Sequence, residues 1–322
     1  MNYSSDEVNG PAVAAILIIE MALGLVANSI VLVITFTQRQ SWKQPSTIFF
    51  TSLILAHLVL LLLYLPFFIV SSIAGEWVFG KTLQEKRDSC SVAAYIIWYS
   101  ALVITLTLSV ISFDRFLFIV KPNQYKAFMK QRVALCLTIT IWLLAALLNS
   151  TPLYGLGEFG YRSYGTCVPL WEDNRGYVFY MLIVFALAVS VIIITSVWTM
   201  CFTRNFLSHQ SEIAGNSVYT SKKKRLFGIF GTMLIVYVIC LSPGFIVGFL
   251  SQFVDMPEEF YLTMIFCFVA ITFVNPLVQS YFRVDTVMCI KCIHKKIERN
   301  KSSTCYINDD TVSTRFKSKS EP

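Results

Sequence analysis

Seven apolar runs, each of 20 or more residues, recur along the 322 residues of the chain. A hydrocarbon core of about 30 Å needs about 20 residues of helix, so each run is long enough to cross a membrane. Only 14% of the residues are charged, against about a quarter in a typical soluble domain. The runs occupy residues 12–37, 47–73, 91–113, 133–153, 177–203, 226–250 and 260–282. The sequence therefore predicts an all-α membrane protein with one membrane domain, residues 12–282, and no separate soluble enzyme.

The loops between the runs carry an uneven charge that predicts the orientation. One alternate set of loops, together with the C-terminal tail, holds 21 of the 26 Lys and Arg residues. Because basic residues gather on cytoplasmic loops, residues 1–11 are expected outside the cell and the C-terminus inside, in a multi-pass protein of the plasma membrane. The net charge of +7 then fits anionic inner-leaflet lipids rather than a nucleic acid.

Three residues on the outer side are candidates for modification. Cys90 begins the third run and Cys167 lies in the second outer loop, where an oxidising environment lets them form a disulfide. Two free thiols are the alternative. Asn2 begins the sequon Asn-Tyr-Ser and is a candidate glycosylation site.

An acid and a base, Asp114 and Arg115, directly follow the third run and interrupt the apolar stretch "LTLSVISFDRFLFIVKP". Arg115 lies 25 residues after Cys90, about 37 Å along a helix, and so reaches the inner boundary of the membrane. On position alone, Arg115 is equally well a snorkelling interfacial arginine. Further motif residues lie in the other runs and loops: Gly24, Asn28, Leu55, Ala56, Pro66, Trp77, Trp142, Pro152, Cys240, Pro243, Asn275 and Pro276. Over about residues 12–298, these residues and their spacing resemble those of a rhodopsin-like (class A) G-protein-coupled receptor, as a divergent member.

The resemblance implies a seven-transmembrane helix bundle that binds an extracellular ligand and activates a heterotrimeric G protein. Asp114 and Arg115 are the implied coupling residues: Asp114 pairs with Arg115 at rest, and activation frees Arg115 to meet the G protein. Arrestin is a further implied partner. No catalytic residue, cofactor or metal is expected.

The central positions depart from the family pattern. His57 stands where the family usually has a sodium-binding Asp, and Ile104 and Ile271 occupy neighbouring positions that are often polar. A hard cation prefers oxygen ligands, so we predict no sodium regulation. His57 is either a neutral histidine bonded to an Asn or a group that titrates and biases activation. The expected activation switch comprises Asn28, His57, Tyr237, Leu241, Pro243, Asn275 and Pro276.

Two further departures bear on the resting state. The base of the sixth helix carries residues 222–225, all Lys or Arg, where an acidic partner for Arg115 is usual, and Gln279 replaces the usual Tyr. An arginine held only by Asp114 is released more easily, which predicts raised activity without ligand.

Two ligand classes are excluded by single positions. Ile97 replaces the Asp of receptors for biogenic amines, and residues 226–282 contain no Lys that retinal could bond. An aromatic, apolar wall instead favours a lipid-like or other apolar ligand, or a peptide docking on the loops; plain helix packing is the alternative for these aromatics. The expected ligand-binding residues are Phe67, Ile97, Trp98, Ala101, Trp171, Tyr180, Phe245, Tyr261 and Ile265.

The remaining chain is expected to lie in the cytoplasm. Residues 283–298 predict a short amphipathic eighth helix, with Cys289 and Cys292 as palmitoylation candidates, and residues 299–322 a disordered tail. A seven-helix transporter is the alternative function, but the spans contain only Glu20 and His57 as ionisable pathway residues and no internal repeat. A membrane enzyme would need a cluster of catalytic or metal-binding side chains, which three histidines hardly supply.

Overall fold

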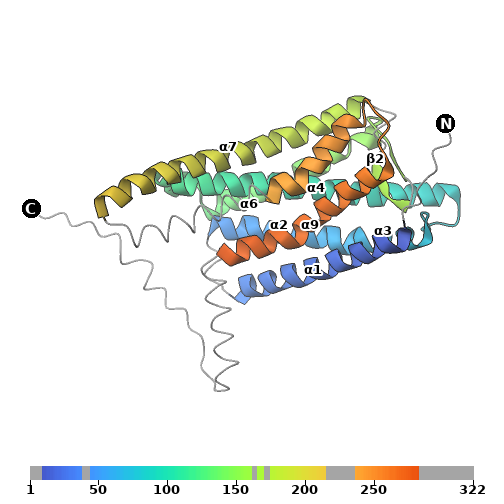
Figure 1. Cartoon of the computed structure of the whole chain (residues 1–322), viewed down its shortest axis with the longest axis horizontal. Helices are drawn as coiled ribbons and strands as arrows, with labels where there is room; N and C mark the ends of the chain where they lie inside the picture. Colours follow the sequence, from blue (N-terminus) through green and yellow to red (C-terminus); the bar gives the residue numbers. More distant parts are fainter. Residues whose placement is uncertain (1–8, 38–43, 162–164, 170–174, 215–235, 283–322) are drawn as a thin grey trace, which may run out of the picture.

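The computed structural model describes residues 9–37, 44–161, 165–169, 175–214 and 236–282, with the backbone path alone for 206–214 and 279–282. Long helices dominate these residues and lie side by side in one bundle (Figure 1). The helices are α1 (Gly10–Thr37), α2 (Pro45–Leu63), α3 (Leu65–Ala74), α4 (Leu83–Val120), α5 (Pro122–Phe128), α6 (Gln131–Asn149), α7 (Arg175–Ala214), the helix Val236–Leu250, and α9 (Glu258–Phe282).

Local sequence signals set several helix boundaries. Pro45 and Pro122 occupy the first turns of α2 and α5, where a missing N–H costs nothing. At the start of α4, the Thr82 hydroxyl accepts a hydrogen bond from the Glu85 N–H at 3.2 Å, and the Glu85 carboxylate accepts one in return. This reciprocal pair satisfies two N–H groups that a helix start leaves free.

The second predicted run is two helices rather than one. α2 ends at Leu63, and α3 starts directly after Tyr64 with Pro66 in its first turn. Proline disfavours helical geometry in the preceding residue and removes one backbone donor, which accounts for the break. Gly75 then ends α3 in the left-handed conformation, φ 74°.

Six described helical segments are long and apolar enough to cross a membrane. The helix Val236–Leu250 is shorter and forms the described part of the sixth predicted run. The predicted third and fourth spans need correction: α4 extends over 83–120 rather than 91–113, because its capping box starts it earlier. α6 ends at 149 rather than 153, because Pro152 opens a separate turn, Thr151–Tyr154.

The centre of the bundle is α4. It contacts α2, α6 and α7, while α1 packs against α2, α3 and α9. A two-stranded hairpin, β1 (Phe159–Tyr161) and β2 (Cys167–Pro169), also lies on α4. Figure 1 shows this hairpin at the end of the bundle where α1 begins, while α9 ends at the opposite end.

Candidate functional site

The hairpin forms a cover anchored to three helices. A disulfide joins Cys167 of β2 to Cys90 of α4, which confirms the expected bridge. Two glycines with positive φ bring the same loop close to its neighbours: a Cβ on Gly165 would lie 2.6 Å from Cβ of Ser71, and one on Gly157 would lie 2.6 Å from the ring of Tyr177. Only glycine fits at such contacts, so the cover is held close against α3, α4 and α7.

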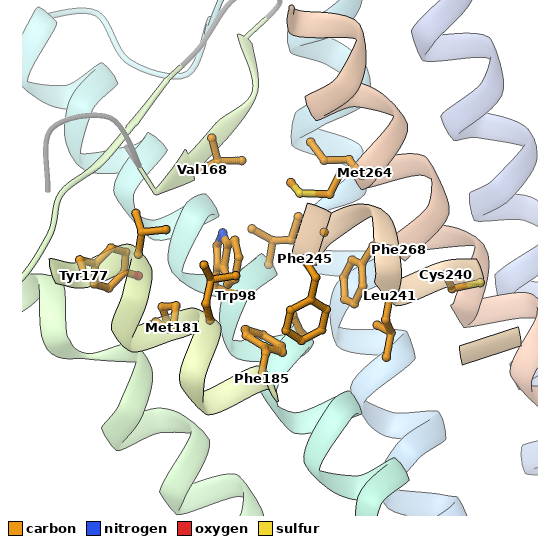
Figure 2. A pocket seen from close by; sticks show the side chains of 16 residues that line it. Trp98, Val168, Tyr177, Met181, Phe185, Cys240, Leu241, Phe245, Met264 and Phe268 are labelled. Atoms are coloured by element: carbon orange, nitrogen blue, oxygen red, sulfur yellow. The ribbon is translucent and has the colours of Figure 1, made fainter. Parts of the chain in front are cut away.

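A cavity lies under this cover, between α4, α7, α9 and the helix Val236–Leu250. The volume of this cavity is about 90 Å³. Figure 2 shows Trp98, Phe185 and Phe245 gathered around it, with Val168 of β2 on its outer side. The lining residues are Ile97, Trp98, Ala101, Val168, Tyr177, Val178, Met181, Leu182, Phe185, Cys240, Leu241, Gly244, Phe245, Met264, Ile265 and Phe268.

Five of the nine residues expected in a ligand wall line this cavity: Ile97, Trp98, Ala101, Phe245 and Ile265. Two others make contacts elsewhere. The Phe67 ring packs on Trp77 and Phe79, with centroids 6.4 and 4.7 Å away, and the Tyr180 hydroxyl donates to the carbonyl of Leu148.

The remaining two expected wall residues are a buried tyrosine and a loop residue. Tyr261 is buried on α9 but does not line the cavity. Trp171 lies outside the described residues.

Most of the α7 wall of the cavity was not predicted. Val178, Met181, Leu182 and Phe185 recur at intervals of three and four, so they share one face of α7. This spacing is visible in the sequence. It is uninformative by itself because an almost wholly apolar span offers several such faces, and the packing of α7 selects one.

A polar network crosses the middle of the bundle. The Asn28 amide nitrogen donates to the carbonyls of Gly24, at 2.7 Å, and Thr272, at 2.8 Å, which tie α1 to α9. Nδ1 of His57 lies 3.1 Å from Oδ1 of Asn28. Since Oδ1 can only accept, Nδ1 of His57 carries the proton in this bond. His57 and Asn28 are fully buried, so the network joins α1, α2 and α9 away from water.

The residues around this network do not suit the sodium ion that the family pattern implies. The Asn28 oxygen already accepts from His57, and His57 presents an N–H toward it. Ile104 and Ile271 are fully buried hydrocarbon side chains. A hard cation needs several oxygen ligands, which this set does not supply.

The remaining expected switch residues lie on two helices. Tyr237 and Leu241 are buried on the helix Val236–Leu250, which also contains Pro243, and Leu241 lines the cavity. Asn275 is buried on α9 immediately before Pro276. The cavity and the activation positions thus share one helix.

The polar pair near the C-terminal end of α4 has a third member. Asp114 is 1% exposed, and its carboxyl group interacts both with the charge of Arg115 and with the hydroxyl of Tyr125 on α5. No ion pair with an N–O distance of 4.0 Å or less joins Asp114 to Arg115, both of which the structure describes, although the Arg115 charge acts on Asp114. The pairing of the two side chains in the resting receptor stays a prediction. Neighbouring residues on a helix point about 100° apart, so Asp114 and Arg115 leave α4 in different directions although both act on Tyr125.

The Tyr125 hydroxyl keeps its proton in this contact. Burial, then the nearby Asp114 carboxylate and the hydrogen bond to it, raise the pKa of Tyr125 above its usual value, and Arg115 only partly opposes them. Tyr125 therefore donates to Asp114 at physiological pH.

Several expected sites fall on residues that the structure does not describe. These are the glycosylation site Asn2, the eighth helix 283–298, and the palmitoylation candidates Cys289 and Cys292. Among the described residues, no group of three or more His, Cys, Asp or Glu side chains is placed to hold a metal ion.

Relatives of the chain are receptors. It is 26% identical to mouse galanin receptor type 3 over 74% of its length and 65% of that receptor. It is 25% identical to a Gq-coupled rhodopsin of Mizuhopecten yessoensis, over 72% of the chain and 48% of the rhodopsin, and 24% identical to galanin receptor 2b of Danio rerio, over 87% and 75%. The chain thus spans less than two thirds of the length of the mouse galanin receptor and of the Mizuhopecten rhodopsin.

The family model for seven-transmembrane receptors of the rhodopsin family matches residues 27–279, which include Asn28, His57 and Thr272 of the polar network, the covered cavity and the Asp114–Arg115 pair. The helix bundle, the motif residues at its centre and the outer disulfide agree with that match. The chain therefore belongs to the rhodopsin family of seven-transmembrane receptors.

Proposed function

We propose that this receptor binds an extracellular ligand in the cavity under the hairpin and activates a heterotrimeric G protein through Arg115. One observation carries the proposal: the same helix, α4, supplies residues of the cavity wall and the Asp114–Arg115 pair. Ile97, Trp98 and Ala101 of α4 line the cavity, and Arg115 follows Ala101 by 14 residues, about 21 Å along the helix axis. Movement of α4 or its neighbours around a ligand is thereby transmitted to the inner end.

The inner end offers a restraint that such movement can release. Tyr125 holds Asp114 from α5, so a shift of α4 relative to α5 breaks a hydrogen bond to a carboxyl group. Arg115 is partly exposed on this surface and is the cationic side chain we assign to the G protein. Arrestin is a second partner for the same surface, and the proposed site of action is the plasma membrane with the hairpin outside.

The proposed ligand is neither a biogenic amine nor retinal. Ile97 places a hydrocarbon side chain at the cavity wall where an amine receptor needs a carboxylate, and α9 contains no Lys for a Schiff base. Some relatives are named as galanin receptors, so a peptide remains the competing ligand class.

Nucleotide exchange on a purified heterotrimeric G protein tests the coupling role. The full chain in lipid nanodiscs should accelerate exchange without added ligand, and Arg115→Ala should reduce this acceleration at least tenfold. Arg132→Ala is the matched control, because Arg132 is an exposed arginine at the start of α6. Exchange by Arg115→Ala equal to that of the wild-type protein would overturn the assignment, and uptake of solutes without any exchange would favour a transporter.

A further inference from the structure

The covered cavity has a side-chain chemistry that limits what it can hold. None of its sixteen described lining residues is Asp, Glu, Lys, Arg or His. Side-chain hydrogen-bonding groups come from three of them: the Trp98 indole, the Tyr177 hydroxyl and the Cys240 thiol. The other thirteen contribute hydrocarbon, thioether or glycine surface. A ligand in this space is therefore surrounded almost entirely by apolar groups.

We infer that the ligand of this cavity is an uncharged, apolar small molecule, held by burial and dispersion with at most a few hydrogen bonds. This inference rests on the proposed ligand site and names the chemical class that fits it. An ammonium or carboxylate group placed here would lose its hydration without gaining a paired charge, which costs several kcal/mol. Apolar cavities tend to hold no ordered water and to accept apolar ligands. A ligand that enters therefore has little bound water to displace from the cavity.

The same wall disfavours insertion of a peptide. Every peptide unit carries an N–H and a C=O that need partners when buried, and three polar side chains cannot serve more than about one residue. The cavity volume of about 90 Å³ has room for several groups of the size of a water molecule. Such a space fits a short hydrocarbon chain or a small ring system rather than a folded peptide segment.

The cover adds a second obstacle to a peptide. Val168 of β2 closes the outer side of the cavity, and the Cys90–Cys167 disulfide holds β2 to α4. Gly165 and Gly157 seat the same loop against α3 and against Tyr177. A peptide that entered would have to lift a loop that is anchored at three places.

The aromatic and sulfur-bearing side chains suit rings and chains of varied shape. Trp98 and Phe185 meet edge to face, with centroids 5.6 Å apart and an interplanar angle of 73°. Met181 and Met264 contribute unbranched thioethers that adapt to irregular surfaces. Their flexibility lets the wall close on guests that differ in outline but share an apolar surface.

Gly244 provides a specific test, because it borders the cavity and tolerates a side chain. A Cβ at Gly244 would meet Met264 at 3.7 Å, an ordinary van der Waals distance, so Gly244→Ala should fill part of the space without moving the backbone. Gly244→Leu adds three more carbons at the same position. Leucine also favours helix more than glycine does, so both variants should fold. Ile246→Phe is the control: it adds bulk to the same helix at a side chain that is 55% exposed.

The experiment uses three ten-carbon probes: 1-decanol, decylamine and decanoate. The thermal midpoint of the full receptor in nanodiscs is measured against the free concentration of each. We expect 1-decanol to raise the midpoint saturably and each charged probe to bind at least tenfold more weakly. Gly244→Ala should weaken the 1-decanol effect, Gly244→Leu should weaken it at least tenfold, and Ile246→Phe should match the wild-type protein.

Equal or tighter binding of a charged probe would overturn the inference, as would no stabilisation by 1-decanol or the same response in Gly244→Leu and Ile246→Phe. The readout requires no G protein, so Arg115→Ala should bind 1-decanol normally. Binding with these preferences but no Arg115-dependent nucleotide exchange would refute the coupling proposal alone. Exchange that depends on Arg115 without selective binding would refute the ligand class alone.

Discussion

The hydroxyl of Tyr125 on α5 lies beside the buried carboxyl group of Asp114 near the C-terminal end of α4, to which it can donate a hydrogen bond. This contact adds a partner for Asp114 beside Arg115, whose charge also acts on Asp114. It joins the long central helix to the short helix that follows it.

Removing the Tyr125 hydroxyl should increase signalling without ligand. A hydrogen bond to a charged group contributes about 1.5–3 kcal/mol, and 1–2 kcal/mol corresponds to a factor of roughly 5 to 30 in an equilibrium. If the bond exists only at rest, Tyr125→Phe should raise ligand-free nucleotide exchange on the order of tenfold. Tyr154→Phe is the matched control, because Tyr154 is 77% exposed. Unchanged exchange in Tyr125→Phe would show that the bond does not restrain activation.

Disrupting the central network should destabilise the bundle. Asn28→Ala leaves the His57 N–H and the Thr272 carbonyl without the Asn28 partner; Pro276, four residues after Thr272, has no N–H to replace it. An unsatisfied buried polar group costs about 1–3 kcal/mol, so the thermal midpoint should fall by several degrees. Asn123→Ala, at an exposed position on α5, should leave it unchanged. A similar midpoint in both variants would mean that the buried bonds contribute no net stability.

Sodium should not stabilise this receptor selectively. The Asn28 oxygen is engaged by His57, and the set of residues lacks the oxygen ligands that a hard cation needs. Thermal midpoints measured in sodium chloride and in choline chloride at equal ionic strength should therefore agree. A saturable, sodium-specific rise would contradict this prediction, and its loss in Asn28→Ala would place the ion at the network.

The disulfide should be needed to keep the cover in place. Cys90 and Cys167 are separated by 77 residues, and closing a loop of that length stabilises the folded state by about 4 kcal/mol in the chain-entropy model. Cys167→Ser should lower the thermal midpoint and weaken 1-decanol binding, since Val168 no longer has a fixed position. Cys201→Ser, which removes an exposed free thiol, should do neither. Undiminished binding in Cys167→Ser would show that the bridge does not shape the cavity.

Much of the architecture could be predicted because hydrophobic length and charge asymmetry are properties of consecutive residues. The seven runs and the positions of Cys90 and Cys167 at one end of the bundle follow from spacing along the chain, whereas the breaks at Pro66 and Pro152 were not predicted. The absence of a carboxylate at Ile97 predicts, through the resemblance to the family, that the ligand is not an amine. The sequence by itself thus determined the class of protein.

The tertiary structure decided which side chains meet. An apolar helix such as α7 has several equivalent faces, and only its packing against α4 turns Val178, Met181 and Phe185 toward the cavity. Asp114 likewise sits beside Arg115 in the sequence, but its contact with Tyr125 joins two helices and depends on how α5 docks on α4. The rotation and docking of helices are set by the sum of many weak contacts, which no short stretch of residues encodes.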